Sequence, residues 1–243
     1  MSAETMQIHD PSVTDIVDEA EIWSSLLPLD GARVIELGCG AAAHTCAIAG
    51  TGRPASVLAC EVDDIQHEKN CAATDIPAGV AFARAGAEAI PAEDDSADIV
   101  MMFKSLHHVP MESMDAAMAE IRRVLRPGGV AYISEPVYAG DFNEVLRLFH
   151  DEGEVRRAAF EAVRRAVAEG TLELAEQRFF NTRNDFEDFA DFENKVLGVT
   201  HTEHNLSPEL HQTVRETFEQ YMGPEGARFE MPIRVDLLRH PAV

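Results

Sequence analysis

The sequence predicts an α/β protein built on a doubly wound, mostly parallel β-sheet. Short apolar segments alternate five times with segments of helical spacing before Glu135, a pattern typical of parallel strands joined by crossover helices. The stretch 34–45 is the second observation. It begins with two β-branched residues that favour a strand, continues through Gly38 and Gly40, which permit a tight turn, and ends in an alanine-rich run that favours a helix.

The individual elements follow from hydrophobic periodicity. The stretch 99–103 is an unbroken apolar run of the kind that is buried on both faces of a sheet. The stretch 112–125 carries one apolar stripe at helical spacing and is followed by a proline and two glycines, which end a helix. The expected strands cover 34–37, 56–60, 80–83, 99–103 and 130–134, and the expected helices between them cover 42–49, 64–75 and 112–125.

Before the first strand, residues 1–12 are polar and predict a loose arm. Residues 13–29 have apolar side chains at helical spacing, with Ser12 or Thr14 as the cap and Pro28 as the stop. We therefore expect a helix that lies over the sheet as a lid, with Trp23 packed beneath it.

The second half of the chain has a different composition, because ten of the 12 phenylalanines fall at or after Phe142. Its periodicity is mostly helical over 141–169 and 184–222, with a strand at 172–180 between them. Residues 229–237 alternate strictly and predict a closing strand over 229–239, whose paired part should start at Ile233 because Pro232 lacks an N–H group. We expect a single domain over 1–243, divided into a core over 30–136, a mostly helical cap over 137–228 and the closing strand 229–239.

Composition limits the partners. The formal net charge of -23 disfavours nucleic acid, because phosphate binding requires clustered Lys and Arg. No apolar run approaches the roughly 20 residues that span a bilayer, so we expect a cytoplasmic protein without a membrane partner. The four cysteines predict neither a disulfide nor a metal site. The histidines His201, His204 and His211 are expected to be solvated loop residues rather than metal ligands.

The strand, glycine turn and helix at 34–45 indicate a ligand site, because free N–H groups at the start of the helix point to the space above the turn. Glu61 ends the next apolar segment, where an acid binds ribose hydroxyls of a nucleotide-like cofactor. Nicotinamide dehydrogenases and S-adenosylmethionine-dependent methyltransferases share this arrangement. Ala43 satisfies the Gly-x-Gly-x-x-Ala form of a dinucleotide site, whereas no Tyr-x-x-x-Lys pair for hydride transfer is found.

Five motifs in order resemble the class I small-molecule methyltransferases of the type 11 family. They lie at 34–40, 60–62, 87–100, 106–110 and 121–129, so the likeness covers about residues 30–136. The resemblance implies a Rossmann-like methyltransferase fold with seven strands, an antiparallel last strand at the closing segment and a helical substrate cap. It also implies S-adenosylmethionine as the cofactor.

Carried over by position, the resemblance assigns the cofactor site. Glu36 matches the acid near the amino-acid part of the cofactor, Glu61 matches the acid that accepts both ribose hydroxyls, and Ala87 falls where a backbone N–H meets the adenine. Lys104 falls where the end of the fourth strand passes under the cofactor. The remaining expected contacts adjoin these positions and are Gly38, Cys39, Gly40, Thr45 and Val62. Ala42 and Gly86 depart from the pattern, since a glycine and an aspartate are usual there.

Catalytic residues are expected at the acceptor side. His107 and His108 follow the fourth strand, and an imidazole has the near-neutral pKa that a general base requires. Adjacent side chains diverge, so one is expected to face the acceptor while its neighbour packs. The resemblance places this pair and Glu135 beside the acceptor. We expect methyl transfer to O, N or C of a small, partly apolar metabolite, with an NAD(P)-dependent oxidoreductase or a noncatalytic cofactor or small-molecule binder as alternatives.

Overall fold

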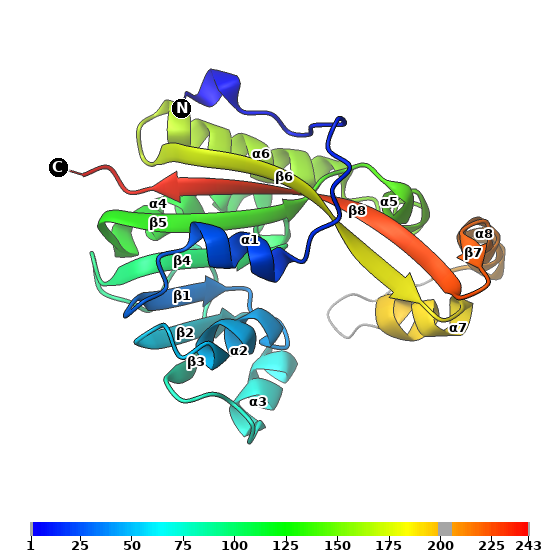
Figure 1. Ribbon diagram of the computed structural model, residues 1–243, viewed down its shortest axis with the longest axis horizontal. Helices are drawn as coiled ribbons and strands as arrows, with labels where there is room; N and C mark the ends of the chain where they lie inside the picture. Colours follow the sequence, from blue (N-terminus) through cyan, green and yellow to red (C-terminus); the bar gives the residue numbers. More distant parts are fainter. Residues whose placement is uncertain (1, 199–205, 243) are drawn as a thin grey trace.

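The computed structural model describes residues 2–198 and 206–242, and it is organised around one central sheet (Figure 1). The strand order β3-β2-β1-β4-β5-β8-β6 confirms the predicted doubly wound, mostly parallel sheet of seven strands, and the short β7 adds an eighth strand beside β8. The first five strands are parallel, and β8 is antiparallel to both β5 and β6. The strands are β1 (Arg33–Leu37), β2 (Ser56–Glu61), β3 (Val80–Arg84), β4 (Ala97–Phe103), β5 (Leu125–Pro136), β6 (Glu173–Phe186), β7 (Met222–Gly223) and β8 (Gly226–Arg239).

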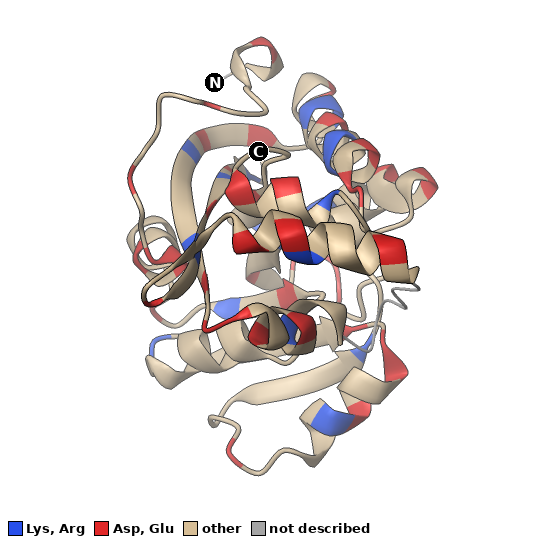
Figure 2. Cartoon of the chain, turned by 90° about the vertical axis from the view of Figure 1, so that its right-hand side faces the viewer, with Lys and Arg blue, Asp and Glu red and all other residues tan. Residues whose placement is uncertain are grey.

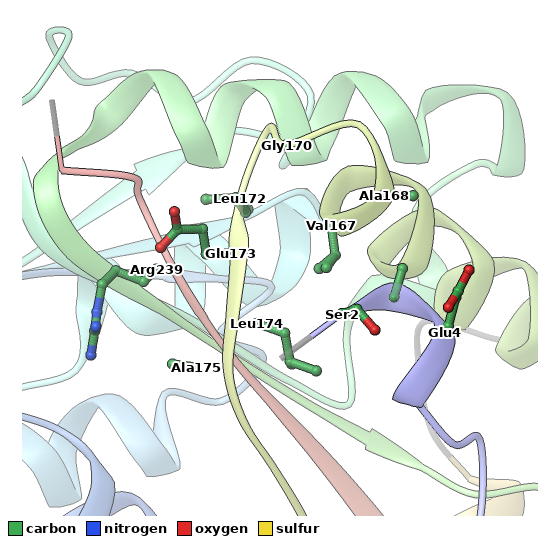
Figure 3. Close-up of a pocket in the computed structure, with 11 residues that line it drawn as sticks. Ser2, Glu4, Val167, Ala168, Gly170, Leu172, Glu173, Leu174, Ala175 and Arg239 are labelled. Atoms are coloured by element: carbon green, nitrogen blue, oxygen red, sulfur yellow. The ribbon is translucent and has the colours of Figure 1, made fainter.

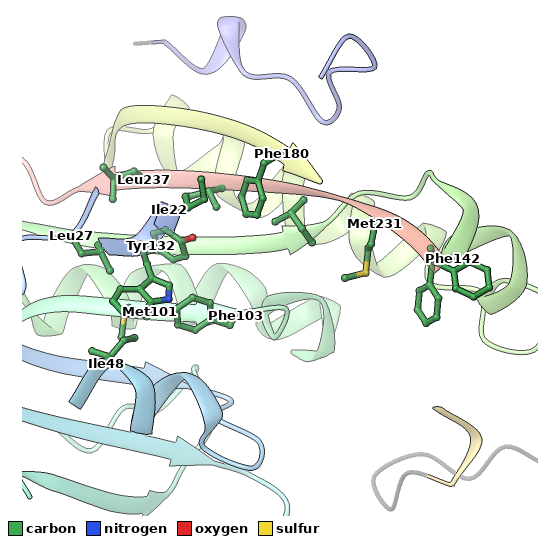
Figure 4. Packing of buried hydrophobic residues seen from close by; sticks show 14 of the residues in the cluster. Ile22, Leu27, Ile48, Met101, Phe103, Tyr132, Phe142, Phe180, Met231 and Leu237 are labelled. Atoms are coloured by element: carbon green, nitrogen blue, oxygen red, sulfur yellow. The ribbon is translucent and has the colours of Figure 1, made fainter. Parts of the chain in front are cut away.

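Helices cover both faces of this sheet, because the strands bury side chains on both sides. Val34 packs into one hydrophobic cluster with α1 and α2, whereas the next residue, Ile35, packs into the other cluster with α4 and α6. Figure 4 shows Ile22 of α1 near Tyr132 of β5 within the first cluster. The α-helices are α1 (Glu19–Leu26), α2 (Ala43–Gly50), α3 (Asp64–Ala72), α4 (Met114–Val124), α5 (Asp141–Leu146), α6 (Gly153–Ala168), α7 (Phe189–Phe192) and α8 (Pro208–Glu219).

The shorter helical turns are η1 (Ala3–Thr5), η2 (Leu106–His108), η3 (Met111–Ser113) and the π-helical turn η4 (Glu193–Leu197). No helix of the described ranges is both long enough and apolar enough to cross a membrane. Figure 2 shows Asp and Glu on several helices of one side of the molecule, in line with the 43 acidic against 20 basic residues.

The expected helix at 13–29 is wrong in its first third. The helix α1 starts only at Glu19, where the Asp18 side chain accepts a hydrogen bond from the Ala20 N–H. Residues 13–18 instead run along the open edge of β6, where Val17 N–H donates to the Asn181 carbonyl (2.9 Å) and Asn181 N–H donates to the Asp15 carbonyl (2.8 Å). An edge strand offers unpaired backbone groups, and pairing with them outweighs the helical spacing of a few apolar residues.

The segment 137–228, expected as a mostly helical cap, divides into two parts. The helix α6 packs beside α4, and β6 joins the main sheet over 14 residues, so both belong to the main layers. The strand exceeds its expected range because it pairs with β8 along its whole length. Pairing between β8 and β5 starts at Ile233 as expected, whereas pairing with β6 includes Pro232 and continues to Ala227.

The remaining helices of this segment gather where β6 and β8 extend beyond the parallel strands (Figure 1). Phe186, Phe189 and Phe192 are buried there and pack on Phe218, with ring centroids between 5.1 and 6.0 Å from it. The structure thus places these three rings in the core of the extension.

Candidate functional site

The carboxyl ends of β1, β2 and β4 meet at one edge of the sheet, and the glycine turn lies there. Gly38 adopts a left-handed φ of 68°, and a Cβ at this position would lie 2.7 Å from Cβ of Ser105, which follows β4. The N–H groups of Gly38 and Cys39 donate to the carbonyl of Cys60 on β2, at 2.9 and 3.0 Å. Only a glycine fits this close approach, so the turn joins three strand ends into one site.

Ala42, which stands where the family pattern has a glycine, caps α2 with φ 60° and ψ 26° and is buried. A left-handed alanine costs about 1 kcal/mol, but burial of its methyl group contributes about 0.8 kcal/mol. We therefore expect the free energy of unfolding of the Ala42→Gly variant, measured by urea denaturation, to lie within about 1 kcal/mol of the wild-type value, because the two effects nearly cancel. The Ala42→Val variant should be clearly less stable, since a β-branched residue does not tolerate positive φ. A large stabilisation by glycine would contradict this account.

Glu61 closes the turn from the side of β2. One carboxylate oxygen accepts from Gly40 N–H (2.7 Å), and the other accepts from the N–H groups of Val62 (2.8 Å) and Asp63 (2.9 Å). The opposite side of the turn is held by Asn70 of α3, whose amide donates to the Gly40 carbonyl at 2.7 Å. Sequence reasoning missed Asn70, because nothing local distinguishes a buried asparagine in a polar helix from a surface one.

Glu36 is the second carboxylate at this edge, and it is almost completely buried at the end of β1. Thr45 of α2 donates to it through Oγ1 at 2.5 Å. Burial raises the pKa of Glu36 to about 7; the Thr45 hydrogen bond opposes this rise and the charge of Glu61 adds to it. Neither Glu36 nor Glu61 has a salt-bridge partner in the part of the chain that the structure describes. Among the described residues, the edge therefore holds two acidic side chains that have hydrogen-bond donors but no cationic partner.

The outer contacts expected for the cofactor surround these two acids. Cys39 is buried, with its sulfur 3.7 Å from the Asn70 amide nitrogen, and Ala87 is buried after β3. Val62 is 61% exposed, so its side chain is open to solvent beside Glu61. Gly86 stands where the family pattern has an aspartate. The carboxylate of Glu88 occupies the volume that a side chain on Gly86 would take, so an acidic group lies at this place from a neighbouring residue.

Lys104 follows β4 in a strained conformation, with φ 54°, and its N–H donates to the Ser134 carbonyl at 2.7 Å. Its ammonium lies 3.8 Å from the carboxylate of Glu19, which is buried and accepts a hydrogen bond from the Ser134 hydroxyl. Sequence reasoning missed Glu19, because the helix was expected to start before this residue and nothing local marks it as buried. The start of α1 at this residue brings it to the carboxyl ends of β4 and β5.

The histidine pair consists of one buried and one exposed residue, but the two rings lie side by side and do not diverge as we expected. His107 is 4% exposed, and its Nδ1 lies 2.6 Å from Glu135, whose other oxygen accepts from Leu106 N–H (2.9 Å). The ring of the exposed His108 lies against that of His107, with centroids 4.1 Å apart and the ring planes tilted by 42°. His107 and Glu135 thus form a buried hydrogen-bonded pair. His107 lies two residues after Ser105, which contacts the glycine turn.

A further acid, Glu152, approaches the same pair from the loop before α6. Its Oε1 lies 3.6 Å from Nε2 of His107, and its Oε2 accepts from the Arg156 guanidinium. Burial by itself lowers the pKa of His107, but the charges and hydrogen bonds of Glu135 and Glu152 outweigh it and raise the pKa to about 9. Glu152 is far from any motif in the sequence, so only the fold reveals it.

A cavity of about 850 Å³ lies elsewhere, between η1 and the turn that joins α6 to β6 (Figure 3). None of the expected site residues lines it.

The remaining expectations concern isolated side chains. His211 is paired with Glu193 at 2.6 Å, whereas His201 and His204 lie outside the described residues. The four cysteines are all free, as expected.

Comparison with known proteins agrees with this geometry. Residues 35–133 match the model of a methyltransferase domain, type 11. A fatty-acid O-methyltransferase of Mycolicibacterium smegmatis is 26% identical over 204 residues, which cover 83% of this chain and 63% of that protein. The phthiotriol/phenolphthiotriol dimycocerosates methyltransferase 1 of Mycobacterium ulcerans is 31% identical over 125 residues, which cover 51% of this chain and 45% of that protein. The chain thus spans less than two thirds of either relative.

Among solved structures, one from Bacillus halodurans C-125 superposes with a TM-score of 0.61 at 18% identity, over 93% of this chain and 99% of that chain. This likeness shows the shared fold. The matched domain includes the glycine turn, Glu61 and the His107–His108 pair, which the structure brings to one edge of the sheet. Residues 35–133 therefore form a methyltransferase domain of type 11, and the chain as a whole has the fold of the methyltransferase structure with which it superposes.

Proposed function

We propose that this protein transfers a methyl group from S-adenosylmethionine to an oxygen, nitrogen or carbon of a small, partly apolar molecule. The observation that carries the proposal is the pair of carboxylates, Glu36 and Glu61, that lie beside the glycine turn without a salt-bridge partner among the described residues. Two carboxylates, which accept hydrogen bonds and carry negative charge, fit this cofactor, because it has ribose hydroxyls, an ammonium group and a sulfonium. The relatives' names support a lipid or fatty-acid acceptor, and we keep the cytoplasm as the proposed location.

Each residue then has a defined task. Glu61 accepts hydrogen bonds from the ribose hydroxyls, and Glu36 compensates positive charge near the amino-acid part. The other proposed cofactor contacts are Gly38, Cys39, Gly40, Thr45, Val62, Ala87 and Lys104. When bound, the cofactor supplies a methyl group on a sulfonium, which makes alignment of the acceptor and exclusion of water the main requirements.

On the acceptor side we propose His107, His108 and Glu135. The Glu135 carboxylate fixes the ring of His107 through Nδ1, and the raised pKa of this imidazole keeps it protonated near neutral pH, so we assign it to orienting the acceptor rather than to taking its proton. His108 is exposed, and we assign it to direct contact with the acceptor. A carboxylate acceptor needs no base, so these residues would then align the acceptor rather than deprotonate it.

Isothermal titration with S-adenosylmethionine tests the cofactor, and formation of S-adenosylhomocysteine with fatty acids and hydroxylated lipids tests the transfer. We expect micromolar binding and product with at least one acceptor. Failure to bind the cofactor would refute the proposal. Fluorescence of bound NADH would favour an oxidoreductase, and tight cofactor binding without product across the panel would favour a noncatalytic binder.

Binding of the cofactor should depend on pH through Glu36. Because its folded pKa is raised from 4.5 to about 7, the free protein loses stability as pH rises through this window, while a cationic ligand favours the ionised form. We therefore expect affinity to rise by up to about tenfold per pH unit below 7 and to level off above it. Titrations of wild type and Glu36→Gln at several pH values check this result. An identical slope in the variant would contradict the assignment to Glu36.

A further inference from the structure

The buried histidine and its neighbours form a cluster with the composition of a metal site. His107, His108 and Glu152 each offer one ligand atom, and these atoms all lie within 4.8 Å of one another. Ligands held at about 2.0–2.2 Å from one tetrahedral zinc ion are separated from each other by roughly 3.3–3.5 Å. The distance of 3.6 Å between Nε2 of His107 and Oε1 of Glu152 is close to this separation.

The orientation of His107 fits a ligand role. Its Nδ1 is 2.6 Å from the buried Glu135, so its Nε2 faces Glu152. A carboxylate that hydrogen-bonds the rear nitrogen of a histidine is the usual support of a metal-bound imidazole, because it fixes both the ring and the tautomer.

Glu152 is also held in place by a neighbour, Arg156, as His107 is by Glu135. Arg156 donates to its Oε2 through Nε (3.0 Å) and Nη2 (2.5 Å), which leaves Oε1 directed at the histidines. His150 also approaches this oxygen, with Nε2 at 3.0 Å. One carboxylate oxygen therefore lies among imidazole nitrogens from two separate segments of the chain.

We propose that His107, His108 and Glu152 bind one divalent transition-metal ion, such as Zn²⁺, with an open position on the acceptor side. Imidazole and carboxylate ligands favour zinc and its neighbours over Mg²⁺ or Ca²⁺, which prefer oxygen ligands alone. An ion here would orient an acceptor oxygen or nitrogen at its open position. That role rests on the proposed methyl transfer, whereas metal binding itself does not. The sequence alone predicted no metal site, because Glu152 lies outside every motif.

The test uses the full chain, treated with chelator and then titrated with Zn²⁺ by calorimetry and with Co²⁺ by visible absorption, whose bands report the coordination. We expect one ion per chain. The variants His108→Ala and Glu152→Gln should each weaken binding by at least about tenfold. His211→Ala is the matched control, because His211 also pairs with a glutamate, Glu193, but belongs to no such three-ligand group among the described residues.

The site would be overturned if wild type and both ligand variants bound the metal ion equally. It would also be overturned if the His211→Ala variant, and not the ligand variants, lost the bound ion. Circular dichroism checks that each variant is folded, and His108 is exposed, so its loss should leave the core intact. Titration of the same preparations with S-adenosylmethionine separates the two proposals. Cofactor binding without metal binding rejects only the metal site, and metal binding without cofactor binding rejects only the proposed function.

Discussion

Replacement of Glu61 by alanine is expected to weaken binding of S-adenosylmethionine by about 100-fold, because two charge-assisted hydrogen bonds to ribose hydroxyls are worth roughly 3 kcal/mol together. The carboxylate is already held in place by three backbone N–H groups, from Gly40, Val62 and Asp63. Little ordering is therefore needed when the ligand arrives, and most of the lost interaction should appear as lost affinity. Isothermal titration of wild type and variant measures the difference.

Two further variants separate the ribose contact from support of the turn. Glu61→Gln keeps the shape and one acceptor oxygen, so its loss should be smaller than that of Glu61→Ala. Asn70→Ala removes the hydrogen bond to the Gly40 carbonyl without touching Glu61. If Asn70→Ala weakened binding as strongly as Glu61→Ala, the effect would come from the turn and not from the ribose.

The Glu135→Leu variant should lose about 3–5 kcal/mol of unfolding free energy, because it leaves Nδ1 of the buried His107 without its hydrogen-bond partner. Glu135 is completely buried, hydrogen-bonded to the His107 ring and to Leu106 N–H, so a leucine satisfies neither group. For a chain of this size the loss corresponds to a fall in melting temperature of roughly 10 °C. Chemical denaturation and calorimetry provide the two measurements.

The double variant His107→Leu, Glu135→Leu is the control for this reasoning. An apolar pair leaves no unpaired charge, so the double variant should recover at least part of the stability that Glu135→Leu loses. Glu152 keeps Arg156 as its partner in all three proteins. If the double variant were less stable than Glu135→Leu, the two residues would not be coupled, and the burial of His107 against Glu135 would have another cause.

The sequence and the structure agree best where the signal is local. The strands β1, β2 and β4 each have their apolar pattern and their proposed site residue within a few positions, so Glu36, Glu61 and Lys104 could be placed at strand ends before the fold was known. The parallel order of these strands then required the ends to meet. Residues 13–18 failed the same reasoning, because their conformation depends on the open edge of β6 and not on their own spacing.

The sequence by itself determined the fold class and the methyltransferase domain at 35–133, and it predicted the edge of the sheet for the cofactor, since these depend on motifs that are each contiguous in the chain. Only the tertiary structure decided which histidine is buried, and it alone brought Glu19, Asn70 and Glu152 to the site. The reason is physical. A buried polar side chain is defined by the partner that compensates its desolvation, and these partners come from segments whose approach is set by packing across the whole sheet.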